Sequence, residues 1–222
     1  MYRYEKKYST DDNYLSQILS LIKMHPSGFN EVYKERTVNS IYFDSFNFDL
    51  YNQSINGDLK RKKFRIRWYA NDSKIFSFLE IKQKEGEKGS KNRYNLLPIS
   101  SEQNITREFL RNLLYKSNIK NSDLIINFDK YSPILICSYQ RKYFLSSNQK
   151  IRLTIDYKIS YSNFFYESSI SRVNKIYDSK MVMEYKYDYF LASEFFISEN
   201  ILNLRRTRFS KFSNGVEILY GR

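Results

Sequence analysis

The 222-residue sequence has few of the residues that usually carry covalent or nucleophilic chemistry. Its one cysteine, Cys137, excludes both a disulfide framework and a cluster of thiolate metal ligands. Its one histidine, His25, precedes Pro26 in an expected loop, and nothing nearby completes a nucleophilic triad. We therefore expect Cys137 and His25 to be structural. With only 6 glycines and 3 prolines, the chain is neither disordered nor of low complexity.

Long apolar runs are absent as well. No stretch approaches the roughly 20 apolar residues that a membrane-spanning helix needs. Residues 1–8 lack the apolar core of a signal peptide. The glycine-rich phosphate loop G-x-x-x-x-G-K-[ST] does not occur either. We therefore expect a cytoplasmic protein without a membrane span, and one that does not bind nucleotides through a P-loop.

Positive charge and aromatic side chains are abundant instead. The chain has 37 Lys and Arg against 24 Asp and Glu, which gives a net charge of +13. This excess predicts an anionic partner such as nucleic acid, a nucleotide, polyphosphate or a membrane headgroup. The 21 tyrosines and 17 phenylalanines favour strands. The length fits a single domain over residues 1–222.

The residue patterns predict an α+β fold built on an antiparallel sheet. Residues 45–56 fit either a short helix or an irregular turn, and the basic segment 205–211 is expected to end in a turn at Asn214-Gly215. Helices are expected at 12–24, 104–117 and 189–204, with a helical extension at 122–128. Strands are expected at 2–8, 37–44, 60–69, 74–84, 91–95, 134–145, 151–161 and 180–187.

Nearly every expected strand has one charged face and one apolar face. In residues 60–69, Lys63, Arg65 and Arg67 alternate with three large apolar residues, so a strand places the two sets on opposite faces. An ordinary strand with its basic face in solvent would look the same. The charged face recurs, however, in Glu5/Lys7, Glu80/Lys82/Lys84, Arg141, Arg152 and Glu184/Lys186.

Two architectures would accommodate so many charged faces. An open sheet would expose them as a platform for nucleic acid, although the sequence contains no Gly-aromatic motif of the RNP type. A closed antiparallel barrel of about eight strands would turn them into its interior and bury the apolar faces under outer helices. Cations confined in such a lumen need anions to neutralise them, so the barrel predicts a polyanionic ligand such as a linear triphosphate or polyphosphate.

Seven short motifs follow one another in order along almost the whole chain. They are Arg3-Tyr-Glu-Lys-Lys-Tyr8, Ser40-Ile-Tyr-Phe-Asp44, Arg61-Lys-Lys-Phe-Arg-Ile-Arg-Trp-Tyr69, Leu79-Glu-Ile-Lys82, Tyr139-Gln-Arg141, Met183-Glu-Tyr-Lys186 and Phe209-Ser-Lys-Phe-Ser213. Together they resemble the VTC domain of the triphosphate tunnel metalloenzymes. The resemblance implies a closed β-barrel tunnel with helices packed outside. It also implies a polymerase that transfers the γ-phosphate of ATP to growing inorganic polyphosphate.

The resemblance also implies roles for individual residues. Five basic residues become the catalytic set, namely Arg65, Arg67, Lys82, Arg141 and Lys211. The remaining phosphate ligands are Lys7, Lys91, Arg152 and Lys186, assisted by Tyr139 and Ser210.

Carboxylates beside bound phosphates suit a hard divalent cation, Mn²⁺ or Mg²⁺. The resemblance makes Glu184 a metal ligand. Glu5 and Glu80 are further candidates, with neutralisation of neighbouring lysines as the alternative. Arg3-x-Glu5-x-Lys7 replaces the Glu-x-Glu-x-Lys of the CYTH branch, and the loss of one carboxylate weakens a two-metal hydrolytic mechanism.

The expected partners are therefore ATP or another nucleoside triphosphate and inorganic polyphosphate, and nucleic acid is disfavoured. Two other functions stay open at this point. One is a metal-dependent tripolyphosphatase or nucleoside triphosphatase. The other is a non-catalytic module that binds polyphosphate or nucleic acid.

Overall fold

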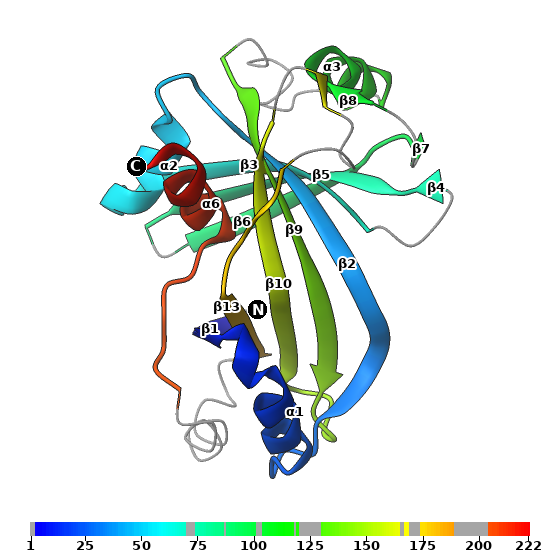
Figure 1. Ribbon diagram of the computed structural model, residues 1–222, viewed down its shortest axis with the longest axis vertical. Coiled ribbons are helices and arrows are strands. Elements are labelled where there is room, and N and C mark those ends of the chain that lie inside the picture. Colours follow the sequence, from blue (N-terminus) through cyan, green and yellow to red (C-terminus); the bar gives the residue numbers. More distant parts are fainter. Residues whose placement is uncertain are drawn as a thin grey trace. The chain divides into compact units, whose positions relative to one another are not determined.

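A computed structural model describes residues 3–69, 74–86, 88–100, 104–117, 119, 130–164, 167–168, 174–188 and 204–222 (Figure 1). The chain divides into two compact units, each built from separate segments. Unit 1 comprises Met1–Thr37, Tyr139–Ile159 and Tyr177–Ser210, and unit 2 comprises Val38–Ser138, Ser160–Ile176 and Lys211–Arg222. That residues 1–222 act as one functional domain stays a prediction.

The long strands follow one hydrogen-bonded path in the order β1-β13-β10-β9-β2-β3-β5-β6. The pairs with a defined register are antiparallel, so the expected α+β class with an antiparallel sheet is confirmed. Among the described residues no pairing joins β1 to β6, and closure into a barrel stays a prediction. The bounds are β1 Arg3–Asp11, β2 Asn30–Asp44, β3 Lys60–Tyr69, β5 Ser77–Glu85, β6 Lys88–Asn95, β9 Ser132–Leu145, β10 Arg152–Asn163 and β13 Lys180–Asp188.

Short strands complete the sheets. β12 (Ile176–Tyr177) pairs with β10, outside the main path. β11 (Glu167–Ser168) pairs with β8 (Ile105–Thr106), and β4 (Lys74–Ile75) pairs with β7 (Ile99–Ser100). The single strand expected at 74–84 is therefore two strands, β4 and β5, that belong to different sheets.

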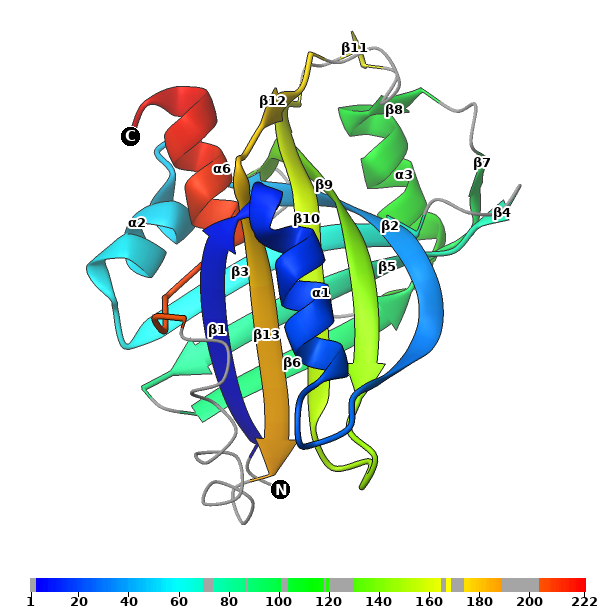
Figure 2. The same cartoon turned by 60° about the horizontal axis from the view of Figure 1, so that its bottom comes forward.

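In unit 1, helix α1 covers the apolar face of β13 and β10 (Figure 2). Asp11 caps the preceding 3₁₀ turn η1 (Asp12–Tyr14) by accepting from the Asn13 backbone N–H at 2.9 Å, and α1 follows at Leu15–Lys23. Its buried Ile18 and Ile22 pack into a core with strand residues such as Leu153, Ile155, Met181 and Met183. Because alternate residues face opposite sides, this core commits Lys7 and Glu184 to the other face of the sheet.

In unit 2, strands β3 and β5 bury Phe64, Ile66, Leu79 and Ile81 on one face. Helices α2 (Asp49–Asn56) and α6 (Lys211–Tyr220) lie side by side in both views (Figures 1 and 2). Helix α3 (Arg107–Lys116) begins after Thr106, whose side chain accepts from the Phe109 N–H at 3.0 Å. Because the apolar face of β3 is buried, Lys63, Arg65 and Arg67 must lie on its opposite face.

Helix α6 corrects the expected turn at Asn214-Gly215. The helix continues through both residues, although Gly costs about 1 kcal/mol relative to Ala in a helix interior. A Cβ at Gly215 would lie 2.8 Å from Tyr161 Cδ1 and 3.1 Å from Leu135 Cδ2. This glycine therefore permits close packing of the helix and does not mark its end.

The other expected helices have different outcomes. Residues 45–56, which fitted either a short helix or a turn, contain α2. The helix expected at 189–204 and the extension at 122–128 lie outside the described residues, except for Leu204. Within the described residues, no helix is both long and apolar enough to cross a membrane.

Candidate functional site

In unit 2, three basic side chains converge on the carboxylate of Glu80. The β3–β5–β6 register places Arg65 opposite Glu80, and Lys91 two residues away on the neighbouring strand. Arg65 donates from Nε to Glu80 Oε2 at 2.7 Å, and its Nη2 lies 2.6 Å from the same oxygen. Lys91 Nζ lies 2.5 Å from Oε1, and Arg67 Nη1 lies 3.8 Å from Oε2. Glu80 itself is only 2 % exposed, and the Arg65 and Arg67 side chains beside it are largely buried.

The electrostatics of this cluster keep Glu80 ionised. Burial opposes its charge, but Arg65, Arg67 and Lys91 outweigh burial and hold its pKa far below the ordinary value. The pKa of Lys91 is lowered by burial, which outweighs the attraction of Glu80. Three cations share one carboxylate, so the cluster keeps a net positive charge that favours a phosphate oxyanion.

Two neighbouring elements of unit 2 complete the surroundings of Arg65. On β2, Tyr42 accepts a hydrogen bond from Arg65 Nη1 at 3.1 Å. At the start of α6, the centroid of the Phe212 ring lies 5.4 Å from that of the Tyr42 ring. The Lys63 ammonium also lies 5.4 Å from the centroid of the Phe212 ring. Lys211 precedes Phe212 as the first residue of α6, and Lys82 lies opposite Lys63 and Lys91 in the strand register.

In unit 1, a second cluster lies on the polar face of β1 and β13. Lys7 Nζ lies 3.0 Å from Glu5, and Lys186 Nζ lies 2.7 Å from Glu184 and 3.7 Å from Glu5. Burial opposes the charge of Glu184, but Lys186 and Lys7 lower its pKa far below the ordinary value. Burial likewise opposes the charge of Lys7, yet Glu184 and Glu5 raise its pKa. The cluster therefore pairs two carboxylates with two ammonium groups.

Arg141 belongs to the same unit and is held by Asp156. Its Nε and Nη2 donate to the two carboxylate oxygens at 2.5 and 2.6 Å. Asp156 is 1 % exposed. Burial opposes the charge of Arg141, but Asp156 outweighs it and raises its pKa. This bidentate pair fixes the plane of the guanidinium group.

Three further predicted ligands of unit 1 lie beside these charged residues, namely Tyr139, Arg152 and Ser210. The Arg141 guanidinium lies 5.2 Å from the centre of the Tyr139 ring. Arg152 is exposed and lies opposite Lys186 in the register of β10 with β13. Ser210 follows Phe209, whose carbonyl oxygen lies 3.5 Å from Lys7 Nζ. The structure thus groups Tyr139, Arg152 and Ser210 with the charged residues of unit 1.

The carboxylates of unit 1 fit a divalent cation better than Glu80 does. Glu5 and Glu184 both reach the single ammonium of Lys186, so two carboxylates already converge on one positive charge. Glu80 is surrounded by three cations. Among the described residues, no group of three or more His, Cys, Asp or Glu side chains is placed to hold a metal. A cation at Glu5 and Glu184 would therefore need further oxygen ligands from phosphate and water.

Comparison with known proteins identifies the family. Residues 2–220 match the family model of the VTC domain. The chain belongs to the VTC domain family. The family expected from the seven sequence motifs is thereby confirmed. None of the curated protein sequences matches this VTC domain.

Two solved structures share the fold of this VTC domain. One, from Vibrio parahaemolyticus, is provisionally assigned as an adenylate cyclase. It is 11% identical, has a TM-score of 0.51, and the match covers 95% of each chain. The other, from Hippeastrum, carries the same provisional assignment and has a dominant triphosphatase activity. It is 14% identical, also has a TM-score of 0.51, and the match covers 99% of this chain and 97% of the other. At these identities the likeness extends to the fold alone.

Sequence reasoning missed Asp156 and Tyr42 as partners of the VTC domain's arginines. The register of the β9–β10 hairpin would have identified Asp156. The Ser146 N–H donates to the Ile151 carbonyl at 3.0 Å, and counting five residues outward from each brings Arg141 opposite Asp156. The expected arms, 134–145 and 151–161, were given without a register, so this pairing was not predicted. No comparable signal connects Tyr42 to Arg65.

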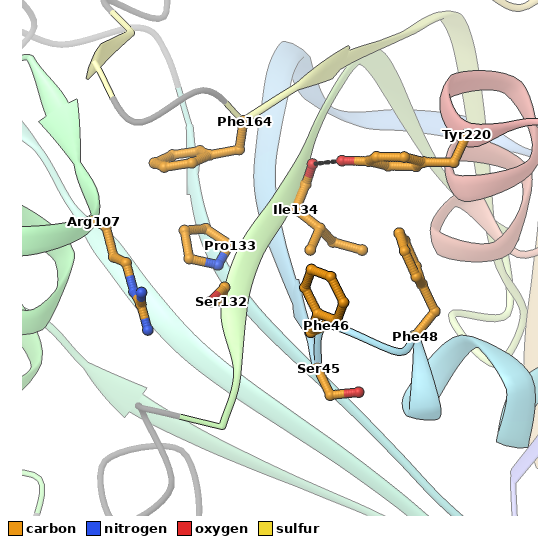
Figure 3. A pocket seen from close by; sticks show the side chains of 9 residues that line it. All are labelled: Ser45, Phe46, Phe48, Arg107, Ser132, Pro133, Ile134, Phe164 and Tyr220. Atoms are coloured by element: carbon orange, nitrogen blue, oxygen red, sulfur yellow. Dashed lines mark hydrogen bonds between the residues drawn. The ribbon is translucent and has the colours of Figure 1, made fainter.

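Unit 2 of the VTC domain also contains an aromatic pocket of about 290 Å³. Tyr220 donates to the Ile134 carbonyl at 2.7 Å, and Phe48 packs edge-on against Tyr220 at 4.9 Å (Figure 3). The loop before α2 is held by the buried carboxylate of Asp44, which accepts three backbone N–H groups. None of the predicted site residues lines this pocket, which is formed by Ser45, Phe46, Phe48, Arg107, Ser132, Pro133, Ile134, Phe164 and Tyr220.

Proposed function

We propose that this VTC domain is an ATP-dependent polyphosphate polymerase that transfers the γ-phosphate of ATP to a growing polyphosphate chain. The observation that carries the proposal is the unit 2 cluster, in which Arg65, Arg67 and Lys91 are ordered around the buried Glu80. Such a pre-ordered cationic site stabilises the charge that develops on a phosphoryl group during transfer.

The residues of the chain would act mainly by position. Glu80 and Tyr42 orient the Arg65 guanidinium, so little conformational freedom is lost when phosphate binds. The attacking group is a terminal phosphate oxygen that is already anionic, so no general base is required. This agrees with the structural role of His25, which is 4% exposed and accepts from the Ser27 N–H at 3.1 Å. In the transfer, the bond from the γ-phosphorus to the bridging oxygen breaks, a bond to the attacking oxygen forms, and ADP leaves.

The proposal includes Mn²⁺ or Mg²⁺ bound through Glu184 and Glu5. When bound, such an ion neutralises phosphate charge as a Lewis acid. Lys7 and Lys186 would bind phosphate beside these carboxylates, and Arg141 would do so in the orientation fixed by Asp156. Glu80 was also a candidate metal ligand, and its three basic partners favour a positioning role instead.

The remaining predictions belong to the same proposal. Arg65, Arg67, Lys82, Arg141 and Lys211 would contact the transferred phosphate. Lys91, Arg152, Ser210 and Tyr139 would contact other phosphates. The proposal keeps a closed tunnel within one functional domain, as the sequence resemblance implies. ATP as donor would place the reaction in the cytoplasm.

A second function, hydrolysis of triphosphates, is favoured by the dominant triphosphatase activity of the Hippeastrum protein that shares this fold. Hydrolysis and polymerisation would use the same cationic cluster and differ in the acceptor, which is water or a phosphate chain. A non-catalytic polyphosphate binder would retain binding without turnover. The product therefore distinguishes the three functions: polyphosphate for a polymerase, free phosphate for a triphosphatase, and no product for a non-catalytic binder.

The test is to incubate the purified chain with ATP and Mn²⁺ and to separate the products by size on a gel. We expect polyphosphate from the wild type. We expect turnover to fall by roughly a hundredfold or more when Arg65→Ala is combined with Arg67→Ala, because donors that stabilise the developing charge are lost. Lys60→Ala combined with Lys62→Ala is the control, because it removes two charges from the opposite face of β3. Retained turnover in the arginine variant would contradict the site.

A further inference from the structure

The basic face of β3, β5 and β6 is arranged in three cross-strand rows. The rows follow from the antiparallel register, which sets each β3 residue opposite one on β5 and, through it, one on β6. Successive rows are two residues, or about 6.8 Å, apart along the strands. The inner row is Arg65–Glu80–Arg93, the middle row is Lys63–Lys82–Lys91, and the outer row is Arg61–Lys84–Gly89.

The charge balance changes from row to row. The inner row contains Glu80, whereas the middle and outer rows hold five cations and no carboxylate of their own. Of these cations, Lys91 reaches across to Glu80 of the inner row at 2.5 Å. Like charges directly opposite each other on neighbouring strands are destabilising. The other acidic residue of β5, Glu85, has the other parity and pairs with Lys60 at 3.4 Å on the opposite face. The cations of the middle and outer rows are therefore concentrated on the face of the sheet where Arg65, Arg67 and Lys91 surround Glu80.

Burial prevents the strands from relieving this repulsion. A shift of register by one residue would expose Phe64, Ile66, Leu79 and Ile81, which are at most 3% exposed. Exposing these four side chains would cost more than the repulsion between partly solvated cations. A bound polyanion would neutralise the rows without moving the strands.

We propose that Lys63, Lys91 and the outer row bind successive phosphates of a chain that extends beyond the triphosphate held by Arg65, Arg67 and Lys82. The extended anion runs along β3 towards Lys60, over about 14 Å from the inner to the outer row. This inference rests on the proposed function for the place of the reacting triphosphate. It adds Arg61 and Lys84 as chain-length-sensing residues, and affinity therefore rises with the number of phosphates.

The experiment compares two double variants with the same loss of charge. Arg61→Gln with Lys84→Gln removes both outer-row cations, and Lys60→Gln with Lys62→Gln removes two cations from the opposite face of β3. Binding of tripolyphosphate and of size-fractionated long-chain polyphosphate is measured by titration calorimetry without ATP. We expect the outer-row variant to lose about three- to tenfold in affinity for the long chain, as for two exposed ion pairs. We expect less than about twofold change for tripolyphosphate, and for either ligand with the control variant.

Three outcomes would overturn the inference. The first is an equal loss of long-chain affinity in the outer-row and control variants. The second is an equal loss for tripolyphosphate and the long chain. The third is that an RNA oligonucleotide binds as tightly as long-chain polyphosphate and that this binding is lost in the outer-row variant. Nucleic acid would then be the ligand of the rows. Circular dichroism checks that each variant is folded.

The measurement needs no turnover and is therefore separable from the proposed function. Length-dependent binding without any polyphosphate synthesis would contradict the polymerase alone. If polyphosphate is synthesised but affinity in the outer-row variant depends on chain length as in the wild type, only the binding role of the rows would be contradicted.

Discussion

At the scale of single residues, buried carboxylates position the arginines of both clusters. Asp156 binds Arg141 through two oxygens, and Glu80 binds Arg65, Lys91 and, at longer range, Arg67. Both carboxylates are at most 2% exposed. A buried ion pair adds little net stability, but removing one partner leaves an uncompensated charge. These carboxylates are thus more important for the orientation of the arginines than for the stability of the fold.

Asp156→Asn should lower the free energy of unfolding by about 3 kcal/mol, because Arg141 keeps its charge and loses a carboxylate oxygen. Urea denaturation measures this change. Asp156→Leu combined with Arg141→Met should recover most of the loss, because the buried charge is then removed. The double variant should still bind tripolyphosphate more weakly than the wild type, because it lacks the Arg141 guanidinium. A change below about 0.5 kcal/mol in Asp156→Asn, typical of a surface site, would contradict the positioning role.

Glu80 should make the fold sensitive to acid. Its pKa is depressed in the folded protein, so its ionised form stabilises the fold at neutral pH. That contribution is lost as the pH falls below about 4.3, the ordinary pKa of a glutamate, towards the depressed folded value. We expect Glu80→Gln to be less stable at pH 7 and to lose less stability between about pH 5 and pH 2. The exposed Glu85→Gln is the control, and identical acid-unfolding curves for both variants would contradict this account.

The sequence predicts the arginines of the site better than their partners. Alternation along residues 60–69 sets Arg65 and Arg67 on the face opposite Phe64 and Ile66, and burial of those apolar residues bears this out. The partner of Arg141 depends on the register of a hairpin. A one-residue error in the turn moves every side chain to the other face, so the pattern alone does not assign Asp156 as the partner of Arg141.

At the scale of elements, period-2 alternation gives strand positions reliably where one face is buried. β3 spans the expected residues 60–69, and β13 extends the expected strand by one residue. Helix α6 was missed because Asn-Gly is a strong turn signal. The reason for Gly215 lies in residues far along the chain, Tyr161 and Leu135, and no local pattern contains that information.

Gly215→Ala should destabilise the protein, because the new Cβ would lie 2.8 Å from Tyr161 Cδ1. Overpacking costs about 1–3 kcal/mol, which exceeds the gain of about 1 kcal/mol in helix propensity. Because Lys211 begins α6, a displaced helix should also weaken tripolyphosphate binding. Urea denaturation measures the stability, and the exposed Glu217→Ala on the same helix should stay within about 0.5 kcal/mol of the wild type. Greater stability in Gly215→Ala would contradict the close packing.

At the scale of the whole molecule, composition and motifs predict the fold class and the VTC family. They do not predict the division into two units or the difference in charge between the two clusters. Unit 2 gathers its cations around one carboxylate, whereas Lys7 and Lys186 in unit 1 face Glu5 and Glu184. A cationic cluster suits phosphate, and a balanced cluster with two convergent carboxylates suits a divalent cation. The two clusters thus suit different ligands.

The most direct test of the polymerase is the ratio of free phosphate to ADP during ATP turnover with Mn²⁺. Transfer to a chain releases ADP while the γ-phosphate stays bound in polymer. We therefore predict free phosphate well below ADP, with the missing phosphate recovered as polyphosphate. Free phosphate equal to ADP throughout the reaction would show hydrolysis and contradict the account.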